Sequence, residues 1–178
     1  MNNYSRLVLA ATFTTCVCLY AQSASTVVDE ARHAYDHVKD NILKAAEEMP
    51  EQDYSFQPTP DIRTFGQLVG HIAEAQAHYC SAAAGTSTQF SAKGKTSKAD
   101  LVAALKESSD LCDKAYDSVN ESNFSTTAGT GRMQHSKLGI LYGNIVHDNE
   151  EYGYMAVYLR LKGQIPPSSQ AHAMPVSH

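Results

Sequence analysis

The stretch Lys137–Gly163 constrains the fold more than any other part of the sequence, because it has the pattern of one long amphipathic helix. Its apolar side chains recur at steps of three, four or seven residues, as on one face of a helix: Leu138, Leu141, Ile145, Tyr152, Met155 and Leu159. Ser136 is suited to cap the first turn, and Gly163 is suited to end the last one. The rest of the chain must supply the elements that cover this face.

Three further segments have helical periodicity, and no segment has the alternation of a β-strand. Residues 25–48, 64–84 and 98–119 each carry an apolar stripe, and Pro50 and Gly85 end the first two. Thr64 and Gln67 are spaced as a capping box. In the helix at 64–84 we expect the buried face to consist of Phe65, Leu68, Ile72, Ala75, Tyr79 and Ala83. The pattern predicts an all-α four-helix bundle over residues 24–169.

The connection at residues 85–96 bears on the order of the helices. Fully extended, it reaches about 40 Å, whereas a helix of about 20 residues is about 30 Å long. The loop can therefore return along the bundle and start the third helix parallel to the second. Cys80 and Cys112 would then lie at nearly the same height, so a disulfide between them and a parallel helix pair support each other. Two buried free thiols are the alternative.

Residues 1–23 have the composition of a secretory signal peptide. Arg6 precedes an apolar run from Leu7 to Tyr20, and residues 21–23 fit a small-x-small cleavage site. The run is shorter than the roughly 20 residues that span a bilayer. We therefore expect a periplasmic or secreted protein that is not attached to a membrane after cleavage, in a compartment that permits disulfides.

Composition and motifs exclude several function classes. The formal net charge is −5, so no basic surface for nucleic acid is indicated. The chain has no G-x-S-x-G, phosphate loop, H-E-x-x-H or dinucleotide fingerprint. Residues 170–178 have no periodicity, and we expect a flexible tail there.

His71, His147 and Glu151 are the side chains that could carry chemistry. His147 and Glu151 are four residues apart and therefore lie on one face of their helix, while His71 borders the buried face of the helix at 64–84. Two imidazoles and one carboxylate on rigid helices form a ligand set that zinc, nickel, iron or manganese accepts. On spacing alone, the alternative is a set of hydrogen-bonded packing residues, with His147 and Glu151 paired on a wet surface.

Two stretches, PTPDIRTFGQLVGHIAEAQ (58–76) and GNIVHDNEEYGYMAVYLRLKGQIPPSS (143–169), closely resemble the DinB-like family in its exported bacterial branch. The resemblance implies a four-helix bundle in up-down-down-up order. It also implies a divalent-metal site of three histidines, one on the second helix and two, four apart, on the fourth. His71 and His147 match the first two positions, and Glu151 stands at the third.

The resemblance also implies a function and a set of partners. Related proteins are metal-dependent and include thiol S-transferases, so we expect a hydrolase or thiol S-transferase that uses zinc or nickel and acts on an unidentified small molecule. A homodimer is compatible with the family. From its position one turn from His71, Glu74 is expected to act behind the ligands, or a tyrosine such as Tyr154 is. The alternative is a non-catalytic periplasmic binding or stress-related helical module with a degenerate metal site.

Overall fold

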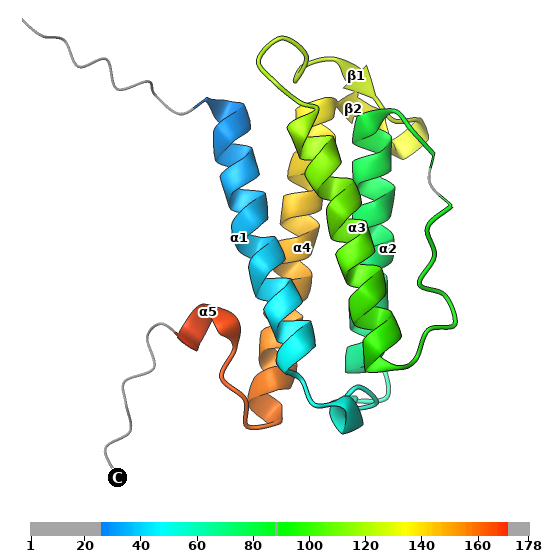
Figure 1. Ribbon diagram of the computed structural model, residues 1–178, viewed down its shortest axis with the longest axis vertical. Helices are drawn as coiled ribbons and strands as arrows, with labels where there is room; N and C mark the ends of the chain where they lie inside the picture. The colour runs from blue at the N-terminus through cyan, green and yellow to red at the C-terminus, as the bar shows by residue number, and fades with distance from the viewer. Residues whose placement is uncertain (1–25, 88, 171–178) are drawn as a thin grey trace, which may run out of the picture.

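Four long helices pack side by side in the computed structural model, which describes residues 26–87 and 89–170 (Figure 1). They are α1 (Val27–Glu48), α2 (Phe65–Ala84), α3 (Lys98–Asp117) and α4 (Lys137–Leu161). The connections contain the 3-10 turns η1 (Glu51–Asp53) and η2 (Gly131–Met133), the strands β1 (Thr127–Ala128) and β2 (His135–Ser136), and the one-turn helix α5 (Pro167–Gln170). The predicted all-α bundle is confirmed, whereas the short antiparallel β1–β2 pair was not expected.

The helices follow the up-down-down-up order. Figure 1 shows α1 and α4 running in one direction and α2 and α3 in the other. The connection after α2 returns along the outside of the bundle, so α3 begins beside the start of α2. A disulfide joins Cys80 on α2 to Cys112 on α3, as the parallel arrangement predicted.

Each long helix begins at a hydroxyl side chain that satisfies a backbone N–H of the first turn. Thr26 and Thr64 form capping boxes with Asp29 and Gln67, and Ser97 and Ser136 accept hydrogen bonds in the same way: the four caps precede α1, α2, α3 and α4. Gly85 ends α2 with φ of 71°, a left-handed conformation that glycine adopts without steric strain. These local signals fix where the helices begin and therefore which side chains meet.

The core consists of two apolar clusters with buried polar side chains between them. One cluster includes Ile42, Phe65, Leu105 and Leu159, and the other includes Tyr35, Cys80, Cys112 and Leu141. The fully buried polar side chains are Gln76, Ser108, Asn144 and Asp148. Buried polar groups are costly unless they are hydrogen-bonded. In this layer the polar groups satisfy one another: Gln76 and Asn144 donate hydrogen bonds to Asp148, and Ser108 donates to Gln76.

The buried face of α2 differs from the prediction in the second half of the helix. Ala75 and Tyr79 are only partly buried, whereas Gln76, Ala77 and Cys80 are buried. The cause is that Gln76 has polar partners inside the bundle and Cys80 is joined to Cys112, so α2 turns this face inward. The spacing of apolar residues in the sequence gives no sign of either interaction.

Of the helices in residues 26–87 and 89–170, none combines the length and the apolar character needed to cross a membrane. The predicted signal peptide at residues 1–23 and most of the predicted tail at residues 170–178 lie outside the described residues.

Candidate metal centre

The fold brings His71, His147 and Glu151 together at mid-height between α2 and α4. The Nε2 atoms of His71 and His147 are 3.2 Å apart. Glu151 Oε1 is 3.4 Å from His71 Nε2 and 3.6 Å from His147 Nε2. These are the three residues that the sequence analysis singled out, and they form a group that could hold a metal ion.

The spacing of these atoms fits a divalent cation. Four donors placed tetrahedrally at about 2.0–2.1 Å from zinc lie about 3.3–3.4 Å from one another. The three observed separations of 3.2, 3.4 and 3.6 Å scatter about that value. In addition, Glu151 Oε2 is buried and has no hydrogen-bond partner. A cation among the three residues would satisfy lone pairs that otherwise face one another.

The centre is accessible from one side. The His71 side chain is 32% exposed, whereas the side chains of His147 and Glu151 are 18% and 9% exposed. Burial lowers the pKa of His71, and the positive charge of Arg63 lowers it further. His71 is therefore biased toward the neutral form, which is the form that coordinates a metal.

Asp148 supports His147 from inside the bundle, and the sequence analysis missed it. Its side chain is fully buried, and its Oδ2 accepts hydrogen bonds from Gln76 Nε2 (3.0 Å) and Asn144 Nδ2 (3.1 Å). Its Oδ1 faces His147 Nδ1 at 3.6 Å. This carboxylate raises the pKa of His147, while burial raises the pKa of Asp148 itself. In metal sites, a carboxylate commonly lies behind a ligating histidine and orients its ring.

The sequence did contain a signal for Asp148. It lies three residues after Ile145 and four before Tyr152, so it fills the one gap in the apolar stripe of α4. A charged residue at a position that the periodicity assigns to the core indicates a buried polar network. Here the network continues to α3, because Gln76 Oε1 accepts a hydrogen bond from Ser108 Oγ at 2.8 Å.

The two predicted second-shell residues have other hydrogen-bond partners. Glu74 Oε1 accepts hydrogen bonds from Ser91 Oγ (3.2 Å) and from the backbone N–H of Ala92 (2.6 Å), and so holds the α2–α3 connection against α2. Tyr154 is half exposed, and its hydroxyl donates to Glu150 Oε1 at 3.2 Å. None of these three hydrogen bonds reaches a candidate ligand.

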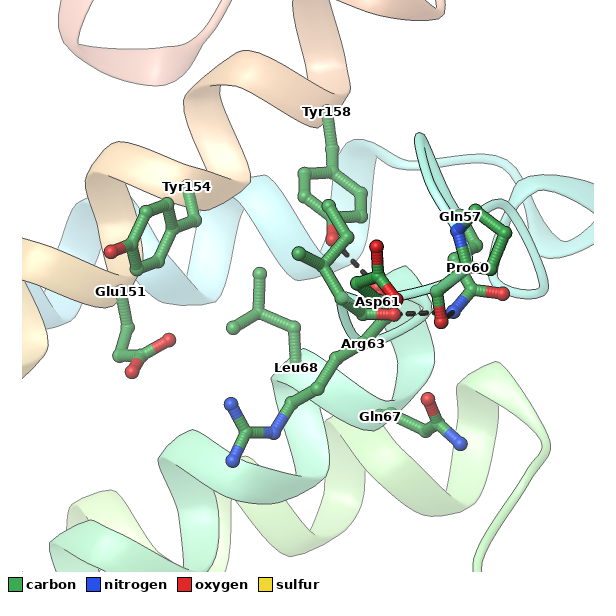
Figure 2. A pocket seen from close by; sticks show the side chains of 10 residues that line it. Gln57, Pro60, Asp61, Arg63, Gln67, Leu68, Glu151, Tyr154 and Tyr158 are labelled. Atoms are coloured by element: carbon green, nitrogen blue, oxygen red, sulfur yellow. Dashed lines mark hydrogen bonds between the residues drawn. The ribbon is translucent and has the colours of Figure 1, made fainter.

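A pocket of about 700 Å³ opens beside the centre, between α4 and the segment that leads into α2 (Figure 2). Glu151, Tyr154 and Tyr158 line it from α4, and Arg63 and Leu68 line it from the other side. A small molecule in this pocket would contact Glu151 and could therefore reach an ion held at the centre.

Comparison with known proteins supports one family. A family model described as the DinB superfamily matches residues 34–155. A search of curated proteins gave no significant match. Among solved structures, a DinB-like protein from Bacillus cereus is similar, with a TM-score of 0.68 and 18% identity over 80% of this chain and 97% of that one.

Two further structures have the same fold. A conserved protein from Enterococcus faecalis has a TM-score of 0.61 and 16% identity, covering 78% of this chain and 98% of that one. A DinB-like protein from Bacillus subtilis has a TM-score of 0.60 and 18% identity, covering 75% of this chain and 92% of that one. At these identities the likeness concerns the fold.

Proposed function

The chain belongs to the DinB superfamily, and from this premise we propose that it is an exported metalloenzyme with a divalent ion on His71, His147 and Glu151. The observation that carries the proposal is the convergence of three donor atoms within 3.2–3.6 Å at the edge of a pocket. These separations favour a tetrahedral ion, so zinc is the first candidate and nickel the second.

The proposed reaction classes are hydrolysis and thiol S-transfer. A divalent ion supplies Lewis acidity, which lowers the pKa of a water or thiol placed beside it. The chain itself supplies three things: the pocket that binds the substrate, the charge of Glu151 next to the two imidazoles, and the buried carboxyl group of Asp148 beside His147 Nδ1.

One observation favours the alternative, a non-catalytic helical module. Glu151 stands where the family resemblance implies a histidine, and its Oε1 lies 3.4 and 3.6 Å from the two imidazoles. At those distances a protonated imidazole can pair with the carboxylate without a metal. The two proposals therefore differ in whether the centre binds a cation.

Metal content of the tag-free protein distinguishes them. We expect about one equivalent of zinc or nickel by elemental mass spectrometry, and loss of that metal in His147→Ala. His78→Ala is the matched control, because His78 is an exposed histidine on the same helix as His71, two turns further along. The control should retain the metal. A parent protein that stays metal-free after reconstitution and dialysis contradicts the metalloenzyme and leaves the binding module.

Substrate class is the next measurement. The metal-loaded protein should be screened with low-molecular-weight thiols plus electrophiles, and separately with small esters and amides. Turnover by the parent and by His78→Ala, but not by His147→Ala, would support an enzyme. No turnover in either screen by a metal-loaded parent would favour a binding role.

A further inference from the structure

Arg63 is a cation without a partner at the edge of the pocket. It lies just before the N-cap of α2 and is exposed, and no hydrogen bond or ion pair joins its guanidinium to another described residue. Arg32, by contrast, binds Asp36 and Asp117, and Arg160 donates hydrogen bonds to the Ala156 carbonyl oxygen and to Ser169 Oγ. Arg132 is exposed and has no such partner among the described residues either, but it does not line this pocket. An unpaired guanidinium beside a pocket is available to a ligand.

The backbone that carries Arg63 is held in place. Tyr158 Oη donates a hydrogen bond to the Arg63 carbonyl oxygen at 2.6 Å, and Gln57 Nε2 donates to the carbonyl oxygens of Pro60 (3.1 Å) and Ile62. The Tyr158 bond ties the wall of the pocket to α4, and the two Gln57 bonds brace the segment before α2. The backbone position of Arg63 is therefore set before any ligand arrives, which reduces the entropy that ordering this segment would cost on binding.

The α4 residue that binds the Arg63 backbone lies close to the candidate metal centre along the helix. Tyr158, which holds Arg63, lies seven residues after Glu151, and seven residues of helix rise about 10 Å. Figure 2 shows the Arg63 guanidinium directed toward the Glu151 side of the pocket, while Asp61 lies with Gln57 and Pro60. The guanidinium and the centre thus face the same space from two sides.

A second observation points to a ligand in this space. Glu151 lines the pocket, its side chain is 9% exposed, and its Oε2 is buried without a hydrogen-bond partner. The lining of the pocket therefore includes a carboxylate oxygen without a partner, on Glu151, and a guanidinium without a partner, on Arg63. A guanidinium pairs well with a carboxylate, because both groups are planar and can form two parallel hydrogen bonds.

We propose that the pocket binds a small anionic molecule, with a carboxylate paired to Arg63 and a metal-binding group at its other end. The inference rests on the proposed function, since the second end needs the ion on His71, His147 and Glu151. It adds the substrate class: carboxylate-bearing molecules of a few carbon atoms, rather than neutral or cationic ones.

Binding of matched probes to the zinc-loaded full chain tests the proposal. The probes are the monohydroxamates of succinic, glutaric and adipic acid, each compared with its neutral primary amide. The hydroxamate binds the metal in both members of a pair. The three chain lengths vary the distance between the hydroxamate and the carboxylate that is to pair with Arg63. At the best length, we expect the acid to bind about fivefold more tightly than the amide in titration calorimetry.

Arg63→Gln should remove that preference while leaving the zinc content and the affinity for the amides unchanged. The control is Arg132→Gln, because Arg132 is an exposed arginine in η2, away from the residues that line the pocket. The control should keep the parent's preference for the acids.

The outcomes separate this inference from the proposed function. If the parent binds neither zinc nor nickel, the proposed function fails and the inference fails with it. If the parent binds zinc and amides but prefers the acid at no length, the inference alone is overturned, and this comparison needs no variant. A preference that survives in Arg63→Gln also overturns it, because the anion would then bind elsewhere.

Discussion

At the scale of single residues, Asp148 is the non-ligand on which the centre should depend most. Its charge is buried, two amides hold one of its oxygens, and the other faces His147 Nδ1. Asp148→Asn keeps the shape but removes the negative charge behind His147. We expect zinc affinity to fall by about 10- to 100-fold, measured by competition with a chromophoric chelator.

Glu150→Gln is the control for that substitution, because Glu150 is an exposed carboxylate on the same helix, next to the candidate ligand Glu151. It should leave zinc affinity within about twofold of the parent. Equal affinities for the parent and Asp148→Asn would show that Asp148 serves the fold and not the metal.

The candidate ligands could be predicted from the sequence, but their surroundings could not. His71, His147 and Glu151 could be predicted because helical spacing and the family resemblance both indicate these positions. Asp148 was missed because a carboxylate in an apolar stripe looks like a break in the pattern. Arg63 was missed because nothing in the sequence shows which pocket it borders. Glu74 is close in sequence to His71, but its carboxylate binds the α2–α3 connection.

At the scale of elements, the Cys80–Cys112 bond should contribute measurably to stability. It closes a loop with a sequence separation of 32, which corresponds to about 3–4 kcal/mol of lost unfolded-state entropy. We expect the Cys80→Ala/Cys112→Ala double variant to lose about that amount in urea unfolding. The reduced parent should lose a similar amount, and a double variant as stable as the oxidised parent would contradict the prediction.

Helix number, order and caps were predictable because each stripe is long and each boundary has its own signal. Thr64 with Gln67 and Gly85 delimit α2 in the structure as in the sequence. The second half of α2 was misplaced because Gln76, a polar residue, is buried by its hydrogen bonds. The strands β1 and β2 have two residues each, too few for any alternation to be visible.

At the scale of the whole molecule, metal binding and folding should be coupled, because the candidate ligands come from both α2 and α4. At 100 times the dissociation constant, a ligand adds about 2.7 kcal/mol to stability, which raises the Tm of a domain of this size by roughly 5–10 °C. We expect zinc to produce such a shift in calorimetry of the parent. The same zinc concentration should not stabilise His147→Ala.

Export is a further whole-molecule prediction. The disulfide within the described bundle is compatible with an oxidising compartment, and the predicted cleavage after residue 23 gives a mature chain that begins near Ala24. Mass spectrometry of the protein recovered from a periplasmic or culture fraction should find that N-terminus. A chain that still begins at residue 1 in that fraction would contradict the prediction.

The predicted homodimer also stays a prediction, which sedimentation at several concentrations would test.

The parallel placement of α2 and α3 has a consequence for proteolysis. Their connection contains Lys93 and Lys95, both exposed, and the disulfide joins residues on either side of it. A tryptic cut at either lysine would break the backbone and still leave one covalent molecule. Such nicked protein should migrate as a single species without reductant and separate into two fragments with it. The cross-link would keep the two halves of the bundle from diffusing apart after the cut.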